Sequence, residues 1–83
     1  MTIALADRLI ELIRTEINPA AGDDLGPDTD LLLTGLVDSL GVVRVVNWIE
    51  DEMGVEVDPV DVTLENFQTV NAMAAYIGRQ ADR

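Results

Sequence analysis

The chain of 83 residues contains no cysteine and no histidine, and all of its basic residues are arginine. These absences exclude disulfides, thiolate nucleophiles and the usual zinc ligands together. Phenylalanine, tryptophan and tyrosine occur once each. No apolar run approaches the roughly 20 residues that a membrane-spanning helix needs, and no signal-peptide pattern follows Met1. We therefore expect a cytoplasmic protein that does not act at a membrane.

Positive charge is also scarce, because 5 arginines stand against 16 acidic residues and the net charge is −11 at pH 7. Such a surface repels nucleic acid and anionic membranes and attracts basic protein surfaces. Solubility alone is the other interpretation of the same charge. Hydrophobic residues make up 48% of the chain, enough for one modest core. We therefore predict a single domain over residues 1–83, and a monomer.

Catalysis by the chain itself is not expected. Ser39 is the only serine, and the sequence offers neither histidine nor lysine as its base. Val37 stands where a nucleophile elbow needs its first glycine. The carboxylates are many, but so small a fold offers no deep cleft that would separate their pKa values. We predict no enzyme activity and no catalytic residue.

A calcium site is the one metal hypothesis that the sequence raises. Asp28-Thr29-Asp30 supplies oxygen ligands in a predicted loop. The loop lacks the glycine, the regular acidic spacing and the terminal glutamate of an EF-hand. We therefore expect no bound metal.

Helical periodicity begins the chain and is followed by a long connection. A first amphipathic helix is predicted over about residues 3–17, and Asn18-Pro19 ends it because the residue before proline is disfavoured in the α region. Residues 18–37 then form a connection that is long for a compact domain. Its leucines are too many for a disordered linker, so we predict an ordered loop held to the core by alternate leucines: Leu25, Leu31, Leu32, Leu33 and Leu36.

A second helix is predicted over about residues 39–53. Asp38 is a strong candidate for its N-cap and Gly54 for its C-cap. The core-facing positions follow helical spacing: Val42, Val45, Val46, Ile49 and Met53. We expect Trp48 to fill core volume or to shape a cavity between the helices.

Two further helices complete the pattern. Thr63 caps a short helix over about residues 63–67 whose Leu64 and Phe67 point inward. Thr69 caps a final helix over about residues 69–78, with Gly78 near its end. The sequence thus predicts an all-α fold.

The second helix also carries a stripe that we expect to face solvent or partners: Leu40, Val43, Arg44 and Asn47. Exposed apolar side chains next to Ser39 would suit a docking patch, whereas burial of the helix on two sides is the alternative. Glu50 and Asp51 lie where the helix dipole disfavours negative charge. Attraction of basic partner surfaces is a reason for their presence.

The segment Gly35-Leu36-Val37-Asp38-Ser39-Leu40, followed by a helix ending in Glu50-Asp51-Glu52-Met53-Gly54, resembles the acyl and peptidyl carrier proteins. The resemblance extends over residues 3 to 78. It implies a small four-helix bundle of the acyl-carrier type, with a long loop between helices 1 and 2 and a short helix 3. It also implies that Ser39, next to Asp38 of the motif, is esterified by 4′-phosphopantetheine from coenzyme A. A phosphate on Ser39 would lie beside the positive end of the helix dipole.

The resemblance implies a carrier with several enzyme partners. A phosphopantetheinyl transferase would attach the arm, and a ligase or synthase would load an acyl or aminoacyl group as a thioester. An acyltransferase or condensing enzyme would then receive that group. Gly41 and Arg44 replace acidic residues that are usual in the fatty-acid carriers, so we predict a free-standing carrier of specialised metabolism. An acidic helical adaptor without a prosthetic group is the alternative, since it predicts the same fold and charge.

Overall fold

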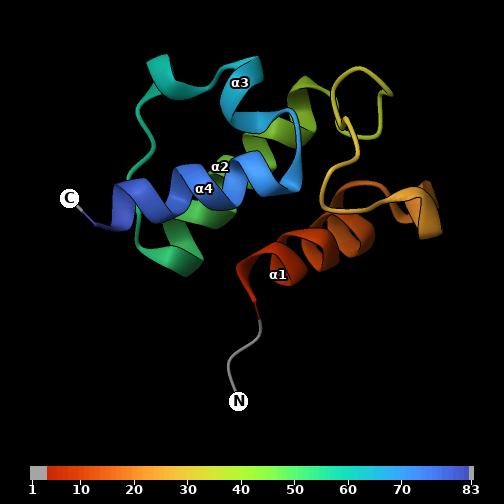
Figure 1. The fold of residues 1–83 in the computed structure, drawn as a ribbon, viewed down its shortest axis with the longest axis horizontal. Coiled ribbons are helices and arrows are strands. Elements are labelled where there is room, and N and C mark those ends of the chain that lie inside the picture. The colour runs from red at the N-terminus through yellow and green to blue at the C-terminus, as the bar shows by residue number, and fades with distance from the viewer. Residues whose placement is uncertain (1–3, 83) are drawn as a thin grey trace.

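The computed structural model describes residues 4–82, and this part of the chain is helical without any strand (Figure 1). Four α-helices, α1 to α4, are joined by segments that contain three shorter helical turns. The predicted all-α fold with a long connection before the second helix and a short third helix is confirmed.

The first helix changes its winding before it ends. Helix α1 spans Leu5–Leu12 and continues as a π-helical turn, η1, over Ile13–Ile17. The N–H of Asn18 closes this wider turn by donating to the carbonyl of Ile13 at 2.7 Å. The predicted start of the helix, Ile3, lies outside the described residues.

The connection after the first helix has more regular structure than the sequence predicts. A 3-10 helix, η2, covers Pro19–Asp24, and the side chain of Asn18 caps it by accepting from the N–H of Ala20. Proline at the first position suits a helical turn because its missing N–H would have no partner there. The predicted ordered loop therefore begins with a 3-10 helix that the sequence analysis did not specify.

The rest of the connection is ordered, but its leucines do not all point inward. Leu25 and Leu31 are buried, as expected, whereas the Leu33 side chain is 86% exposed, against the prediction. Backbone hydrogen bonds join this loop to the start of the last helix and to the segment before it. The Leu31 N–H donates to the Gln68 carbonyl at 2.8 Å, and the Asn71 N–H donates to the Pro27 carbonyl at 3.0 Å.

Helix α2 spans Ser39–Met53, and both of its ends are formed as the sequence predicts. The Asp38 carboxylate accepts from the N–H of Gly41 at 2.8 Å. Gly54 ends the helix with a φ of 64°, a left-handed conformation that glycine adopts without a steric penalty. The predicted core stripe faces inward, with Val42, Val45 and Ile49 buried and Val46 and Met53 partly buried. The helix therefore packs with one face only.

The second half of the chain contains a 3-10 turn, η3 (Pro59–Asp61), helix α3 (Leu64–Phe67) and helix α4 (Val70–Ala81). Thr63 and Thr69 cap α3 and α4 through their hydroxyl oxygens. Phe67 is buried as predicted, but Leu64 is exposed. Helix α4 continues through Gly78 to Ala81, three residues beyond the end that glycine suggested.

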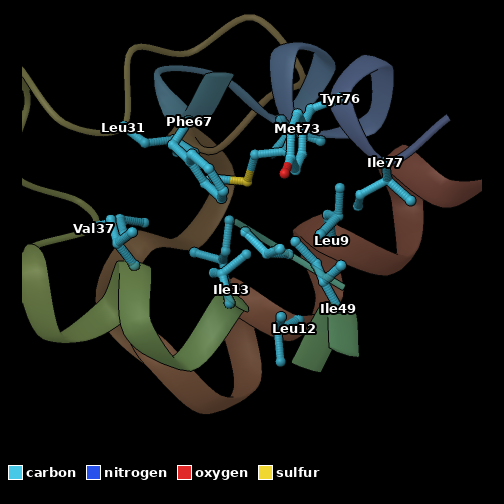
Figure 2. Close-up of a cluster of buried hydrophobic side chains, with 14 of the residues drawn as sticks. Leu9, Leu12, Ile13, Leu31, Val37, Ile49, Phe67, Met73, Tyr76 and Ile77 are labelled. Carbon is cyan, nitrogen blue, oxygen red and sulfur yellow. The ribbon is translucent and has the colours of Figure 1, made fainter. Parts of the chain in front are cut away.

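Side chains from every helix meet in one core (Figure 2). Leu9 and Ile13 come from the first helix, Ile49 from α2, and Phe67 from α3, each almost fully buried. Tyr76 of α4 packs against Phe67 with 5.9 Å between the ring centroids. This core holds one face of α2, and Ser39 lies exposed at the start of the same helix.

Candidate functional site

Ser39 is the first residue of α2, and its side chain is exposed. The preceding Asp38 is held in an extended conformation, and its backbone carbonyl and side chain accept from the N–H groups of Val42 and Gly41. The serine hydroxyl therefore stands at the edge of a capped helix start. Free N–H groups at such a position favour a phosphate group on the hydroxyl.

A pocket of about 530 Å³ opens beside Ser39, between the start of α2, the preceding loop and α3. Ser39 and Asp38 lie in its lining. The rest of the lining is largely apolar: Leu32, Gly35, Val37, Val42, Val43, Val62, Thr63, Leu64 and Phe67. A group attached to Ser39 would therefore meet apolar surface close to the point of attachment.

The large hydrophobic residues that remain exposed in the described chain either line this pocket or lie near a lining residue in the sequence. We name them the apolar rim: Leu33, Leu40, Val43, Val60, Val62 and Leu64. Three of them line the pocket, and the others stand within two residues of a lining residue in the chain. Exposed apolar patches of this kind mark sites of interaction. Sequence analysis identified only Leu40 and Val43, because the other four belong to short turns without a readable period.

The predicted partner residues of α2 divide into two groups. Val43 is 53% exposed and lines the pocket beside Ser39, and Leu40 belongs to the apolar rim. Arg44, Asn47 and Asp51 instead line a groove against the first helix, with Leu12, Glu16 and Trp48. The structure therefore does not bring the predicted partner residues together on one continuous surface around the serine.

Two of those residues also make hydrogen bonds within the chain. Arg44 Nη1 donates to the backbone carbonyl of Glu16 at 2.9 Å. Glu50 Oε2 accepts from the N–H of Val57 at 3.2 Å and so holds the segment that follows α2. Both side chains remain exposed, but each has a structural contact that the sequence did not reveal.

Trp48 lies away from the pocket. Its ring faces the first helix, with the guanidinium carbon of Arg8 5.2 Å from the ring centroid. The residue is half-buried and is absent from the lining of the Ser39 pocket. Trp48 therefore neither lines nor blocks that pocket.

The carboxylates of the Asp28-Thr29-Asp30 segment serve as acceptors for protein groups. Asp28 Oδ1 accepts from Asn71 at 2.7 Å, and Asp30 accepts from the Leu33 N–H at 2.8 Å and from the Gln68 amide at 2.6 Å. The Gln68 hydrogen bond is the main reason that the pKa of Asp30 lies below its ordinary value. Within residues 4–82, no group of three or more acidic, histidine or cysteine side chains is placed to hold a metal ion.

Comparison with protein families shows the family of the chain. The family model described as "Phosphopantetheine attachment site" matches residues 7–77. The chain belongs to this family. A comparison with curated proteins gives no match. Among solved structures, a chain in the crystal structure of an FAD-dependent dehydrogenase is 33% identical, with a TM-score of 0.77 over 84% of this chain and 99% of that chain.

The family's cofactor is a covalently attached 4′-phosphopantetheine. The residues of the site fit this group. Ser39 offers an exposed hydroxyl, α2 offers its N-terminal N–H groups to the phosphate, and the pocket offers apolar surface. Because the chain has no cysteine, any thiol at this site must belong to the cofactor. The helices described between residues 4 and 82 all lack the length and hydropathy needed to cross a bilayer.

Proposed function

We propose that Ser39 carries the 4′-phosphopantetheine arm and that the chain delivers acyl or aminoacyl groups between enzymes of specialised metabolism. The bound arm supplies a thiol that holds the carried group as a thioester. The protein contributes an accessible hydroxyl, a pocket beside it and a surface for docking. The position of Ser39, exposed at the first residue of α2, is the observation that supports this role most directly.

Transfer of the arm needs an enzyme partner, since the serine has no base of its own. Within the described residues, the Ser39 side chain has no hydrogen bond to a group that could remove its proton. A phosphopantetheinyl transferase would supply that group and coenzyme A. Asp38 fixes the start of α2, and the apolar rim provides contact area around the hydroxyl.

We assign docking to the apolar rim together with Arg44, Asn47, Glu50 and Asp51 along α2. A loading ligase or synthase, and an acyltransferase or condensing enzyme, would contact the apolar rim beside Ser39 and the polar side chains along α2 in turn. Tethering gives the carried group a high effective concentration at each active site. Attraction between the acidic carrier and basic enzyme surfaces speeds encounter, while a small contact area allows release.

The similarity to a chain in a dehydrogenase structure supports one further partner. That chain has about the length of this one, because 84% of the present chain covers 99% of it. We propose that a flavin-dependent dehydrogenase oxidises the group carried by this protein. A pair of hydrogens would leave the carried group, and FAD would be reduced to FADH2. We expect the mass of the loaded protein to fall by the mass of two hydrogen atoms. We also expect the absorbance of the oxidised flavin to bleach.

Intact-mass measurement tests the central step. The purified chain is incubated with coenzyme A and a phosphopantetheinyl transferase of broad specificity. We expect the mass of one phosphopantetheine to be added to the natural chain and none to Ser39→Ala. An adaptor without a prosthetic group would stay unmodified in both proteins, and that result would reject the proposal.

A further inference from the structure

The end of the first helix contacts the segment that presents Ser39. The π-helical turn η1 and the residue after it supply three consecutive contacts, from Glu16, Ile17 and Asn18. We name these three residues the helix-1 anchor. Each contact reaches a different part of the segment from residue 36 to residue 44, so that the anchor holds both sides of the serine.

Asn18 holds the chain before the serine. Its side-chain Nδ2 donates to the backbone carbonyl of Leu36 at 3.1 Å, three residues before Ser39. Its Oδ1 accepts from the N–H of Ala20 at 3.1 Å. Because both ends of the amide are engaged, its orientation is fixed, and the position of the Leu36 carbonyl is fixed with it.

Arg44 holds the helix after the serine. Its guanidinium donates to the carbonyl of Glu16 at 2.9 Å. This carbonyl belongs to the last turn of the first helix, where carbonyl groups lack an intrahelical partner and the helix dipole favours a cation. The contact joins the C-terminal end of one helix to the N-terminal half of α2.

Gly41 allows the two segments to approach closely. A Cβ atom at this position would lie 2.9 Å from Cγ2 of Ile17 and 3.0 Å from Cγ1 of Val37. Those distances are shorter than normal contacts between carbon atoms. The first turn of α2 therefore rests against the anchor at its only glycine.

We infer that Asn18 and Arg44 are positioning residues for the modification of Ser39. They hold the first turn of α2 at a fixed orientation relative to the apolar rim, so that an enzyme docked on the rim finds the hydroxyl in place. The inference rests on the proposed function. It also gives Arg44 a role in this chain that does not require contact with any partner.

Asn18→Asp is the sharpest test, because the carboxylate keeps an acceptor for Ala20 and loses the donor to Leu36. Gln80→Glu, in the last turn of α4, is the control for the added negative charge. We expect Asn18→Asp to lower the kcat of transferase loading at least about fivefold with KM within about twofold, since misplacement of a reacting group by about 1 Å can cost far more. Gln80→Glu should load like the natural chain.

Arg44 gives an independent test at an exposed position, where loss of the fold is not expected. Arg44→Lys keeps a donor for the Glu16 carbonyl and should restore most of the kcat that Arg44→Ala loses. Amide hydrogen exchange in residues 39–42 should be faster in Asn18→Asp and Arg44→Ala, while exchange in α4 stays the same. Circular dichroism of each variant checks the fold.

Four outcomes are decisive. Lower kcat with faster exchange in the first turn of α2 supports the positioning role. Unchanged kcat in both Asn18→Asp and Arg44→Ala overturns it, and so does a rise confined to KM in both variants, which would leave these side chains with a docking role alone. A natural chain that takes no arm at all would reject the proposed function itself, so that the two failures remain distinct.

Discussion

At the scale of single residues, the neighbours of Ser39 determine how its hydroxyl is presented. Asp38 caps the helix, and Gly41 lets the first turn approach Ile17. Gly41 stands at a position where the fatty-acid carriers usually have an acidic residue. The structure gives a steric reason for glycine at this position. The absence of an acidic residue at position 41 suggests a change in partner recognition, but close packing explains the glycine as well.

Replacement of Gly41 tests this steric reason, with Gly78 as a matched control. Both glycines lie inside helices, where alanine is favoured by up to about 1 kcal/mol. Nothing lies within 4 Å of a Cβ at Gly78, so Gly78→Ala should stabilise the fold by about 0.5–1 kcal/mol. Gly41→Ala should instead destabilise it by about 1–2 kcal/mol because of overpacking. Urea denaturation measures both; equal stabilisation by the two changes would contradict the close approach.

The pKa of Asp30 tests the contact between the loop and the residues before α4. Hydrogen bonds from the Gln68 side chain and the Leu33 N–H lower the pKa of Asp30 below its ordinary value of 3.8. The folded state therefore gains stability from the ionised form at pH values above that ordinary value, and loses this gain as pH falls through the lowered pKa. Titration by NMR should show a higher Asp30 pKa in Gln68→Ala. Equal values in the two proteins would mean that the hydrogen bond has no effect.

At the scale of helices, the sequence predicted α2 best because its signals are local and agree with one another. Asp38 and Gly54 mark the ends that are found, and the spacing of Val42, Val45 and Ile49 gives the buried face. The start of α2, and hence the exposed serine, could be read from these residues alone. The pocket could not, because it is formed by segments that are distant in the sequence.

Other elements depart from the prediction for physical reasons. The π-helical turn contacts α2 through Glu16 and Ile17, and no local pattern in the sequence marks it. Helix α4 passes through Gly78 because the cost of one exposed glycine is small against the packing of Tyr76 and Ile77. The exposure of Leu33 and Leu64 could not be predicted, because a turn or a four-residue helix has too few positions for a periodic pattern that would identify its buried face.

Tyr76 joins α4 to the turn η3 and offers a test at this scale. Its hydroxyl donates to Asp61 Oδ2 at 2.9 Å, and the Asn66 amide donates to the Asp61 carbonyl at 2.8 Å. Removal of the hydroxyl in Tyr76→Phe should cost about 0.5–1.5 kcal/mol of unfolding free energy. Amide exchange should become faster in residues 60–62, which supply part of the apolar rim.

The same variant has a predicted pH dependence. Burial, followed by the hydrogen bond and the charge of Asp61, raises the pKa of the Tyr76 hydroxyl. The contribution of the Tyr76 hydroxyl to the free energy of unfolding is therefore complete below the unfolded pKa of about 10 and is lost as pH rises beyond it. The stability difference between the natural chain and Tyr76→Phe should shrink above about pH 10. A difference that stays constant into the alkaline range would argue against the buried hydrogen bond.

At the scale of the whole molecule, two properties of the surface act at different distances. The net charge of −11 acts over several ångströms of solvent and is screened by salt. The apolar rim acts only on contact and is concentrated near Ser39. Encounter with an enzyme should therefore depend on salt, whereas the lifetime of the complex should depend on the rim.

Val43→Asp tests the contribution of the apolar rim. Val43 is exposed, so the melting temperature should stay nearly unchanged, while loading of Ser39 should fall because the rim loses apolar contact beside the hydroxyl. Added salt should slow loading of the natural chain and of Val43→Asp in similar proportion. Asp51→Asn is the control, since it removes one negative charge and leaves the apolar rim unchanged. A loss of fold in Val43→Asp would instead assign this side chain to the core.

The central claim is that the single serine bears the arm, and one measurement addresses it most directly. The protein treated with coenzyme A and a transferase is fragmented in the mass spectrometer, and the added mass is located along the chain. We predict that every fragment containing Ser39 carries one phosphopantetheine and that no other fragment does. Added mass on another residue, or none under any transferase, would contradict the account.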